Sequence, residues 1–182
     1  TRPVIMEAYP LEFVNLDGTI ENGNPNVINS DNYNFDLKYE FFPTAKELLA
    51  VTAFSKLIQN PIERLFTQSA GSGGQIITYD NSDNALLVGA ELELLLQLDR
   101  VSDNFKNLSL GFNTSLMYSK VTINKNNTTE TNPDRKRQGA SPWLINADLK
   151  YDFDFSSNWN NTVSLVYNVY GKRIFIIVVS GK

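Results

Sequence analysis

A strict alternation of apolar and polar side chains runs along the thirteen residues from Trp143 to Phe155. Its apolar positions are Trp143, Ile145, Ala147, Leu149, Tyr151, Phe153 and Phe155. Because a β-strand sends successive side chains to opposite faces, this segment predicts a strand with one apolar and one polar face. Aromatic side chains at both ends are typical of a strand that crosses a bilayer, for which about ten tilted residues suffice. A long strand of a soluble sandwich alternates in the same way, so this segment alone leaves both interpretations open.

Other segments of the chain alternate with the same period of two. The apolar positions that share a face are every second residue of 33–41, 86–98, 108–118 and 163–169. Several of these segments exceed the usual strand length of about five or six residues. The stretch 44–59 contains good helix formers at 45–50, but it follows Pro43 and continues with Val51 and Thr52, so we expect mostly strand there. The chain is therefore predicted to be all-β.

The composition excludes several classes of function. The chain has 182 residues, enough for one domain, and contains neither Cys nor His. Disulfide scaffolds, thiolate or imidazole metal sites, and catalysis by Ser-His or Cys-His are thereby excluded. A net charge of −4 and a pI of about 4.9 argue against nucleic-acid binding. No apolar window of about 18 residues exists, so a transmembrane helix is excluded, whereas alternating strands escape such a window average.

Short and long connections alternate along the chain. Short ones at 42–45, 99–106 and 156–158 separate long ones at 22–30, 60–74 and 124–140, which are rich in Asn, Gly, Thr and Pro. In an up-and-down sheet, alternate connections lie at opposite ends, so one end should carry tight turns and the other long loops. That asymmetry is typical of outer-membrane barrels, and a Greek-key sandwich has no reason to produce it.

Aromatic residues fall beside both kinds of connection. Near the short turns are Phe41, Phe42, Phe105, Phe153, Phe155 and Trp159, and near the long loops are Tyr79, Tyr118, Trp143 and Tyr170. Two such rims indicate paired interfacial girdles. The roughly ten residues from Trp143 to Phe153, tilted by about 40°, span about 25 Å, the height of a lipid-facing band. We predict a girdle made of Phe41, Tyr118, Trp143, Phe153, Phe155 and Trp159.

Several stretches resemble one protein family in order and spacing. They are Gly23-Asn24-Pro25-Asn26, Asp31-Asn32-Tyr33, residues 36–43, Val51-Thr52-Ala53-Phe54, Asn60-Pro61-Ile62-Glu63, Gly89-Ala90-Glu91-Leu92-Glu93, residues 138–146 and residues 167–174. Together they resemble the C-terminal β-barrel portion of a TonB-dependent outer-membrane receptor. The resemblance implies an antiparallel up-and-down sheet that forms part of a transmembrane barrel of about twenty-two strands, with a plug domain in its lumen.

The resemblance also implies a function and a set of partners. Such receptors sit in the bacterial outer membrane and import scarce ligands (siderophores, cobalamin, oligosaccharides or peptides) with energy relayed by TonB. The implied partners are the receptor's own plug, the TonB complex, membrane lipid and lipopolysaccharide, with a surface lipoprotein as a further candidate. Both ends of the chain look like cuts, so residues 1–182 are expected to be a partial barrel without the plug and the final strands.

If the apolar faces meet lipid, the opposite faces line the lumen. They would form an acidic wall of Asp36, Glu40, Glu91, Glu93, Asp148, Asp152 and Asp154, partly neutralised by Lys38 and Lys150. We expect Glu91, Glu93, Asp148 and Asp152 to face the plug, and the resemblance makes Glu91 and Glu93 the best candidates to pair with plug arginines. A solvated polar face without a special role is the alternative.

The long loops are the expected ligand-contacting surface. Arg135, Lys136 and Arg137 form a basic cluster that could meet lipopolysaccharide phosphates or an anionic ligand, unless it only keeps the loop solvated. No catalytic, cofactor or metal constellation emerges, since two glutamates two apart on a strand are routine. We therefore expect a non-enzymatic transporter segment. The alternatives are a soluble all-β binding module, such as a lectin-like sandwich, and a passive porin.

Overall fold

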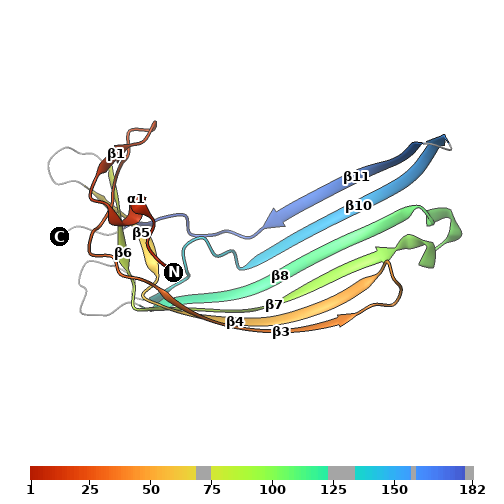
Figure 1. Ribbon diagram of the computed structural model, residues 1–182, viewed down its shortest axis with the longest axis horizontal. Helices are drawn as coiled ribbons and strands as arrows, with labels where there is room; N and C mark the ends of the chain where they lie inside the picture. The colour runs from red at the N-terminus through yellow and green to blue at the C-terminus, as the bar shows by residue number, and fades with distance from the viewer. Residues whose placement is uncertain (69–74, 123–133, 157–158, 179–182) are drawn as a thin grey trace.

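Six long strands dominate the computed structural model, which describes residues 1–68, 75–122, 134–156 and 159–178 (Figure 1). They are β3 (Asp31–Phe41), β4 (Leu48–Gln59), β7 (Asn84–Gln97), β8 (Leu108–Thr122), β10 (Trp143–Ser156) and β11 (Trp159–Tyr170). They pair antiparallel in the order β11-β10-β8-β7-β4-β3, and the two-residue strand β9 (Asp134–Arg135) adds to the end of β8. We call this the large sheet. Its long strands follow one another in sequence order, which confirms the predicted all-β, antiparallel up-and-down fold.

Strand β4 occupies the segment where the sequence also allowed a helix. Nearly its whole length pairs with β3 on one side and β7 on the other. Ala50, a good helix former, lies between Glu40 and Glu93 and is 1% exposed. The two ladders satisfy the backbone groups that a helix would have satisfied internally, and this pairing outweighs a weak local propensity. The strand predicted over most of 44–59 is confirmed.

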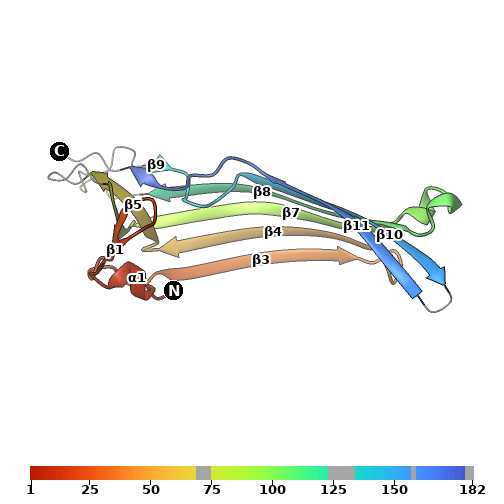
Figure 2. The same cartoon turned by 90° about the horizontal axis from the view of Figure 1, so that it is seen from above.

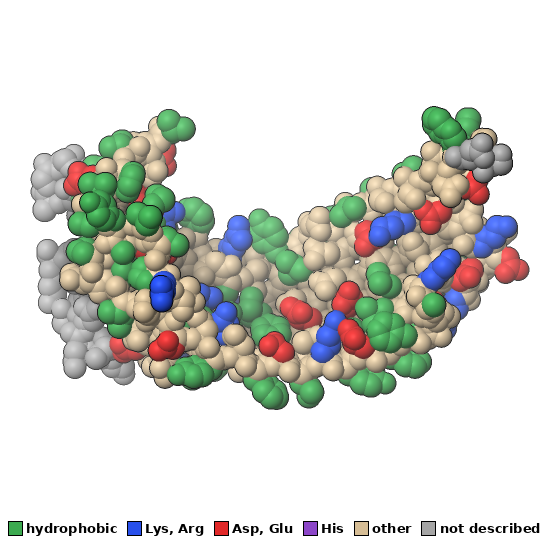
Figure 3. Space-filling view, in the orientation of Figure 1, with side chains coloured by type: hydrophobic (Ala, Val, Ile, Leu, Met, Phe, Trp, Pro, Cys, Tyr) green, Lys and Arg blue, Asp and Glu red, His purple; other side chains and the backbone are tan. Residues whose placement is uncertain are grey.

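The ladder register divides the large sheet into an apolar and a polar face, because directly paired residues share a face. One row across the sheet holds Tyr39, Val51 and Leu92, and the next row holds Lys38, Thr52 and Glu91. Figure 3 shows charged side chains gathered in a hollow, with hydrophobic side chains along the outer edge of the curve. We call the polar side the concave face and the apolar side the convex face.

The convex face is open along its length. Phe35, Tyr39 and Leu165 are 67%, 67% and 71% exposed. Within the described ranges no second sheet packs on this face, as a soluble sandwich would require (Figure 2). An apolar surface of this extent marks contact with lipid or another apolar partner. Among the same residues, no helix has the length and apolarity needed to cross a membrane.

The two kinds of connection separate to opposite ends of the large sheet (Figures 1 and 2). One end carries the turn between β3 and β4, the turn between β7 and β8, and the tip of β10 and β11. The second turn contains two short 3₁₀ helices, η1 (Leu98–Arg100) and η2 (Asp103–Phe105). The described parts of the longer connections lie at the other end, so the predicted asymmetry is confirmed. Of the loop expected over 124–140, only residues from 134 onward lie within the described part.

A small sheet stands at the long-loop end, and its strands run across the direction of the long ones (Figure 1). Its strands are β1 (Glu12–Val14), β2 (Ile20–Asn22), β6 (Gln75–Asn81), β5 (Ile62–Gln68) and β12 (Ile177–Val178), paired in that order. The pairs β2–β6 and β5–β12 are parallel, and a short helix, α1 (Ile5–Ala8), lies beside β6. The expectation of a loop over 60–74 was wrong for 62–68, because β5 finds partners in β6 and in the distant β12.

The buried core is small and lies toward the long-loop end. One cluster on the concave face consists of Ile58, Ala85, Leu87 and Val121, with Met117 packed against it. A second joins Leu65 of β5 to Ile177 of β12, with Ile174 beside them. The second cluster joins β5 to β12 within the small sheet, whereas most of the large sheet has no apolar layer behind it in the described residues.

Candidate functional site

The concave face carries the acidic residues predicted for the lumen. Glu91 and Glu93 of β7 share a face with Asp148 of β10 through the intervening strand β8. Asp152 lies on the same face because it is four residues from Asp148 on β10. Asp36, Glu40, Lys38 and Lys150 follow the same alternation, so the residues predicted to share this face do so.

Most of these carboxylates have a nearby partner. Lys38 Nζ lies 2.6 Å from Glu40 Oε1 and 3.7 Å from Glu93 Oε2. Lys150 Nζ lies 3.5 Å from Asp148 Oδ2, and Thr162 Oγ1 donates to Asp152 Oδ1 at 2.6 Å. The lysines remain about half exposed, and ion pairs this open to solvent contribute little stability. The carboxylates therefore stay available to a chain that fills the hollow, and their pairing with plug arginines stays a prediction.

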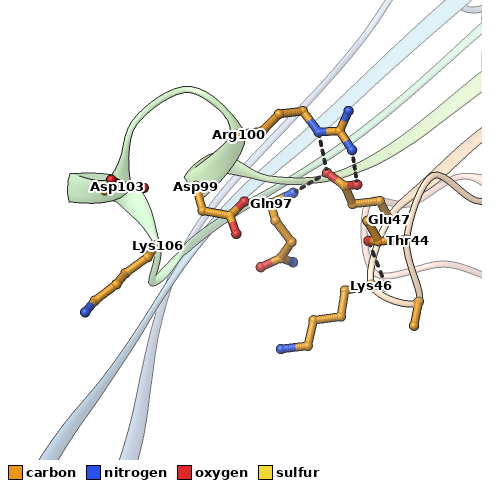
Figure 4. A pocket seen from close by; sticks show the side chains of 9 residues that line it. Thr44, Lys46, Glu47, Gln97, Asp99, Arg100, Asp103 and Lys106 are labelled. Atoms are coloured by element: carbon orange, nitrogen blue, oxygen red, sulfur yellow. Dashed lines mark hydrogen bonds and ion pairs between the residues drawn. The ribbon is translucent and has the colours of Figure 1, made fainter.

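A pocket of about 630 Å³ opens between the two turns at the short-turn end (Figure 4). At its edge the Arg100 guanidinium donates to the Glu47 carboxylate, with Nη2 at 2.6 Å and Nε at 3.2 Å, and the Gln97 backbone N–H adds a bond at 3.4 Å. The bonds from Arg100 lower the pKa of Glu47 despite the buried position of this carboxylate. This pair locks the β3–β4 turn onto the β7–β8 turn. Lys46, Asp99, Asp103 and Lys106 also line the pocket.

A buried acid holds the small sheet together at the other end. Glu21 of β2 accepts hydrogen bonds from the Tyr79 hydroxyl, from Arg64 Nη2 at 3.1 Å and from Asn15 Nδ2 at 3.4 Å. Burial raises the pKa of Glu21, but these three donors outweigh it and the net pKa is lowered. Burial and the bond to this carboxylate raise the pKa of Tyr79 to about 12. One carboxylate thus ties β2 to both strands of the β5–β6 hairpin.

Arg135 of the predicted basic cluster is paired with an acid of the small sheet. Its guanidinium pairs with Glu63 of β5, with N···O distances of 2.9 and 2.6 Å, and the two side chains are only 9% and 3% exposed. Ser82 Oγ donates to the same carboxylate. A charge buried in this way binds its partner instead of an external phosphate. Of the predicted basic cluster, Lys136 remains exposed and Arg137 is half-buried, with its backbone N–H bonded to Ser119 Oγ at 3.2 Å.

Gln138 joins three long connections. Its Oε1 accepts from the Arg64 backbone N–H at 3.0 Å, and its Nε2 donates to the Arg64 carbonyl at 3.3 Å and to the Phe175 carbonyl. Next to it, the Gly139 N–H donates to the Ile174 carbonyl at 2.8 Å. The connections that follow β4, β8 and β11 are therefore one hydrogen-bonded unit, which we call the loop cap.

The predicted girdle residues lie at both ends of the large sheet. The register carries Phe41, Tyr118, Trp143 and Phe153 to the convex face. Phe153 also stacks on Tyr151, with ring centroids 5.7 Å apart. Phe155 and Trp159 flank an irregularity at the tip of β10 and β11 and are 83% and 68% exposed. Whether these six rings meet a bilayer interface stays a prediction.

Two aromatic residues expected on the long-loop rim point elsewhere. Tyr79 belongs to the small sheet, where its hydroxyl is bonded to Glu21. Tyr170 is paired with Leu144, which the register places on the concave face. Position near a loop did not indicate which face each ring would occupy.

Five acids and arginines that organise the two ends were not predicted from the sequence. These are Glu21, Glu47, Glu63, Arg64 and Arg100. Glu63 carried the one usable signal, since it stands between Ile62 and Leu65 in an apolar stretch. Nothing in the spacing connects it to a partner 72 positions away.

Long antiparallel strands that are apolar on an open convex face and charged inside a hollow define a segment of β-barrel wall. The chain belongs to the TonB-dependent receptors, because the family model described as "TonB dependent receptor-like, beta-barrel" matches residues 1–176. This family consists of receptors and transporters of the bacterial outer membrane, not of enzymes.

A solved structure gives a second likeness. The siderophore receptor PirA from Acinetobacter baumannii matches with 18% sequence identity and a TM-score of 0.51 over 86% of this chain. At that identity the likeness shows the fold alone. The match covers 22% of that receptor, so the chain spans about a fifth of its length. No curated protein matches the chain.

Proposed function

We propose that this chain is part of the barrel wall of a bacterial outer-membrane transporter that imports scarce ligands with energy relayed by TonB. The observation that carries the proposal is the pairing of an open apolar convex face with a charged concave face over six long strands. Lipid would cover the first face, and a plug domain would fill the second. Siderophores, cobalamin, oligosaccharides and peptides are the ligand classes to test.

The two ends of the large sheet would face opposite sides of the outer membrane in such a transporter. The short-turn end, fastened by Glu47 and Arg100, would face the periplasm, where the TonB complex acts. The loop cap would face the outside, where it meets ligand, lipopolysaccharide or a surface lipoprotein. Lys136 is the exposed cation of the predicted basic cluster and the one we assign to contact with lipopolysaccharide phosphate.

Uptake in cells that carry the full-length protein tests this proposal. Cells with and without a functional TonB, and with and without the protein, are given labelled members of the four ligand classes in turn. We expect one class to accumulate only when both components are present. Accumulation that needs the protein but not TonB, and that depends only on solute size, would indicate a passive porin instead.

The solubility of the purified chain without detergent distinguishes the barrel-wall proposal from a soluble all-β module. An open convex face predicts aggregation in plain buffer and rescue by detergent micelles, measured by light scattering. A monodisperse monomer without detergent would instead support a lectin-like module whose apolar faces pack on one another.

A further inference from the structure

Two adjoining pockets lie on one face of the small sheet. Their volumes are about 410 and 560 Å³, and both are lined by Arg64 and Phe175. Arg64 is paired with Tyr79 across the β5–β6 hairpin, so the two side chains project from the same face. The two pockets share these two lining residues, and we refer to them together as the Arg64 groove.

The halves of the Arg64 groove differ in chemistry. The larger half is lined mainly by the apolar Leu16, Phe66, Ile77, Phe175 and Ile176, with Asn15, Asp17 and Thr19 as its polar members. The smaller half is lined by Arg64, Arg173 and Tyr79, among others. A ligand that matches both halves has a flat apolar body and a negative charge at one end.

The two arginines of the smaller half differ in their hydrogen bonds and ion pairs. Arg64 gives one edge of its guanidinium to Glu21, while its Nε atom is buried without a hydrogen-bond partner. Arg173 forms no ion pair within the described residues, and its guanidinium lies over the Tyr170 ring, 5.1 Å from the centroid. The one acid that lines this half is Glu7, which accepts a bond from the Val4 N–H at 2.8 Å. Arg173 is therefore the cation left to receive an anion.

The position of Arg173 places the groove at the mouth of the hollow. Tyr170 shares the concave face with Leu144, and the guanidinium of Arg173 lies over its ring. We propose that the Arg64 groove binds an organic anion with an aromatic or similarly flat apolar ring, with the ring against Phe175 and the anionic group at Arg173. That this anion is the cargo rests on the proposed function, whereas the binding itself does not.

Binding of two matched probes to the full-length protein in lipid nanodiscs tests the inference. The probes are 6-fluoro-2-naphthoate and its neutral counterpart 6-fluoro-2-naphthamide, followed by fluorine NMR with empty nanodiscs as the blank. We expect the carboxylate to bind about tenfold more tightly than the amide, the size of one charge-assisted hydrogen bond. Arg173→Gln should abolish this difference, and Lys172→Gln, an exposed neighbour outside the groove, should preserve it.

A second variant reports on the apolar half. Phe175→Ala should weaken both probes by a similar factor, because it removes ring contact without changing charge. Equal affinity of the two probes for the unmodified protein, or a difference that survives Arg173→Gln, would overturn the inference, as would unchanged binding to the Phe175 variant. Since this assay contains no TonB, its failure leaves TonB-dependent uptake untouched, and failed uptake leaves the binding result standing.

Discussion

Arg135 and Glu63 lie 72 positions apart, yet the Arg135 guanidinium donates two hydrogen bonds to the Glu63 carboxylate, at 2.9 and 2.6 Å. Arg135 ends the connection that leads back from β8, and Glu63 begins the β5–β6 hairpin. Both side chains are buried. The pair therefore fixes the small sheet to the large one at the point where the long connections begin.

Glu63→Gln should loosen this junction. The substitution keeps the side-chain volume but removes the carboxylate charge that faces the buried Arg135 guanidinium, which costs about 3 kcal/mol. Backbone amides of β5 should then lose about a hundredfold in hydrogen-exchange protection, measured by mass spectrometry. Lys136→Gln, which alters an exposed neighbour, is the matched control. Equal protection in both variants would mean that the pair does not hold the junction.

Tyr79 should titrate far above an ordinary tyrosine. Burial and the bond to Glu21 raise its pKa from 10.0 to about 12. Because the folded pKa is the higher one, this group's stabilisation is complete below pH 10.0 and is lost as the pH rises toward about 12. Tyrosinate absorbance of the unmodified protein minus that of Tyr79→Phe should show a midpoint near 12. A midpoint near 10 would show that the phenol is neither buried nor bonded.

Two glycines on the concave face should respond differently to alanine. A Cβ at Gly89 would overlap the Leu116 carbonyl oxygen and lie 2.5 Å from the Phe54 ring, so backbone would have to move. The three atoms nearest to a Cβ at Gly111 all belong to the Asp148 carboxylate, which can rotate away. We expect Gly89→Ala to destabilise the barrel by about 1–3 kcal/mol and Gly111→Ala to have little effect, measured by thermal unfolding. The reverse order would contradict this packing.

Reversing the charge of Glu91 and Glu93 together should loosen a plug that is held by their carboxylates. Lysine at both positions would repel plug arginines, and exchange of plug amides in the full-length protein should accelerate. Glu12→Lys, on the small sheet, is the control for added positive charge. If plug protection is the same in all three proteins, these glutamates belong to a solvated wall with no special role.

The large sheet was predictable because each of its strands carries its own sequence pattern. A period of two, repeated over long segments such as 33–41 and 143–155, fixes both the strand state and the face of each side chain. For β4, with helix formers at 45–50, the preceding Pro43 and the β-favouring Val51 and Thr52 were the local signals. The order of short and long connections along the chain then predicts which end of the large sheet carries the turns and which carries the loops.

The loop cap was not predictable because it is held together by contacts between residues far apart in the sequence. Strand β12 pairs with β5 across more than a hundred residues, and Gln138 bonds to Arg64 and Phe175 through backbone groups that carry no side-chain signature. Arg135 looked like an exposed cation because its neighbours are basic and polar. Only the pairing with Glu63 shows that it is buried.

The alternation of environments along β3 tests the central claim, that the convex face meets lipid, most directly. The chain has no native cysteine, so single spin labels can be placed at positions 35–39 of the full-length protein in lipid vesicles. Labels at Phe35, Leu37 and Tyr39 should collide with dissolved oxygen, and labels at Asp36 and Lys38 with a water-soluble nickel chelate. Nickel access at all five positions, or the opposite phase, would contradict a lipid-facing convex surface.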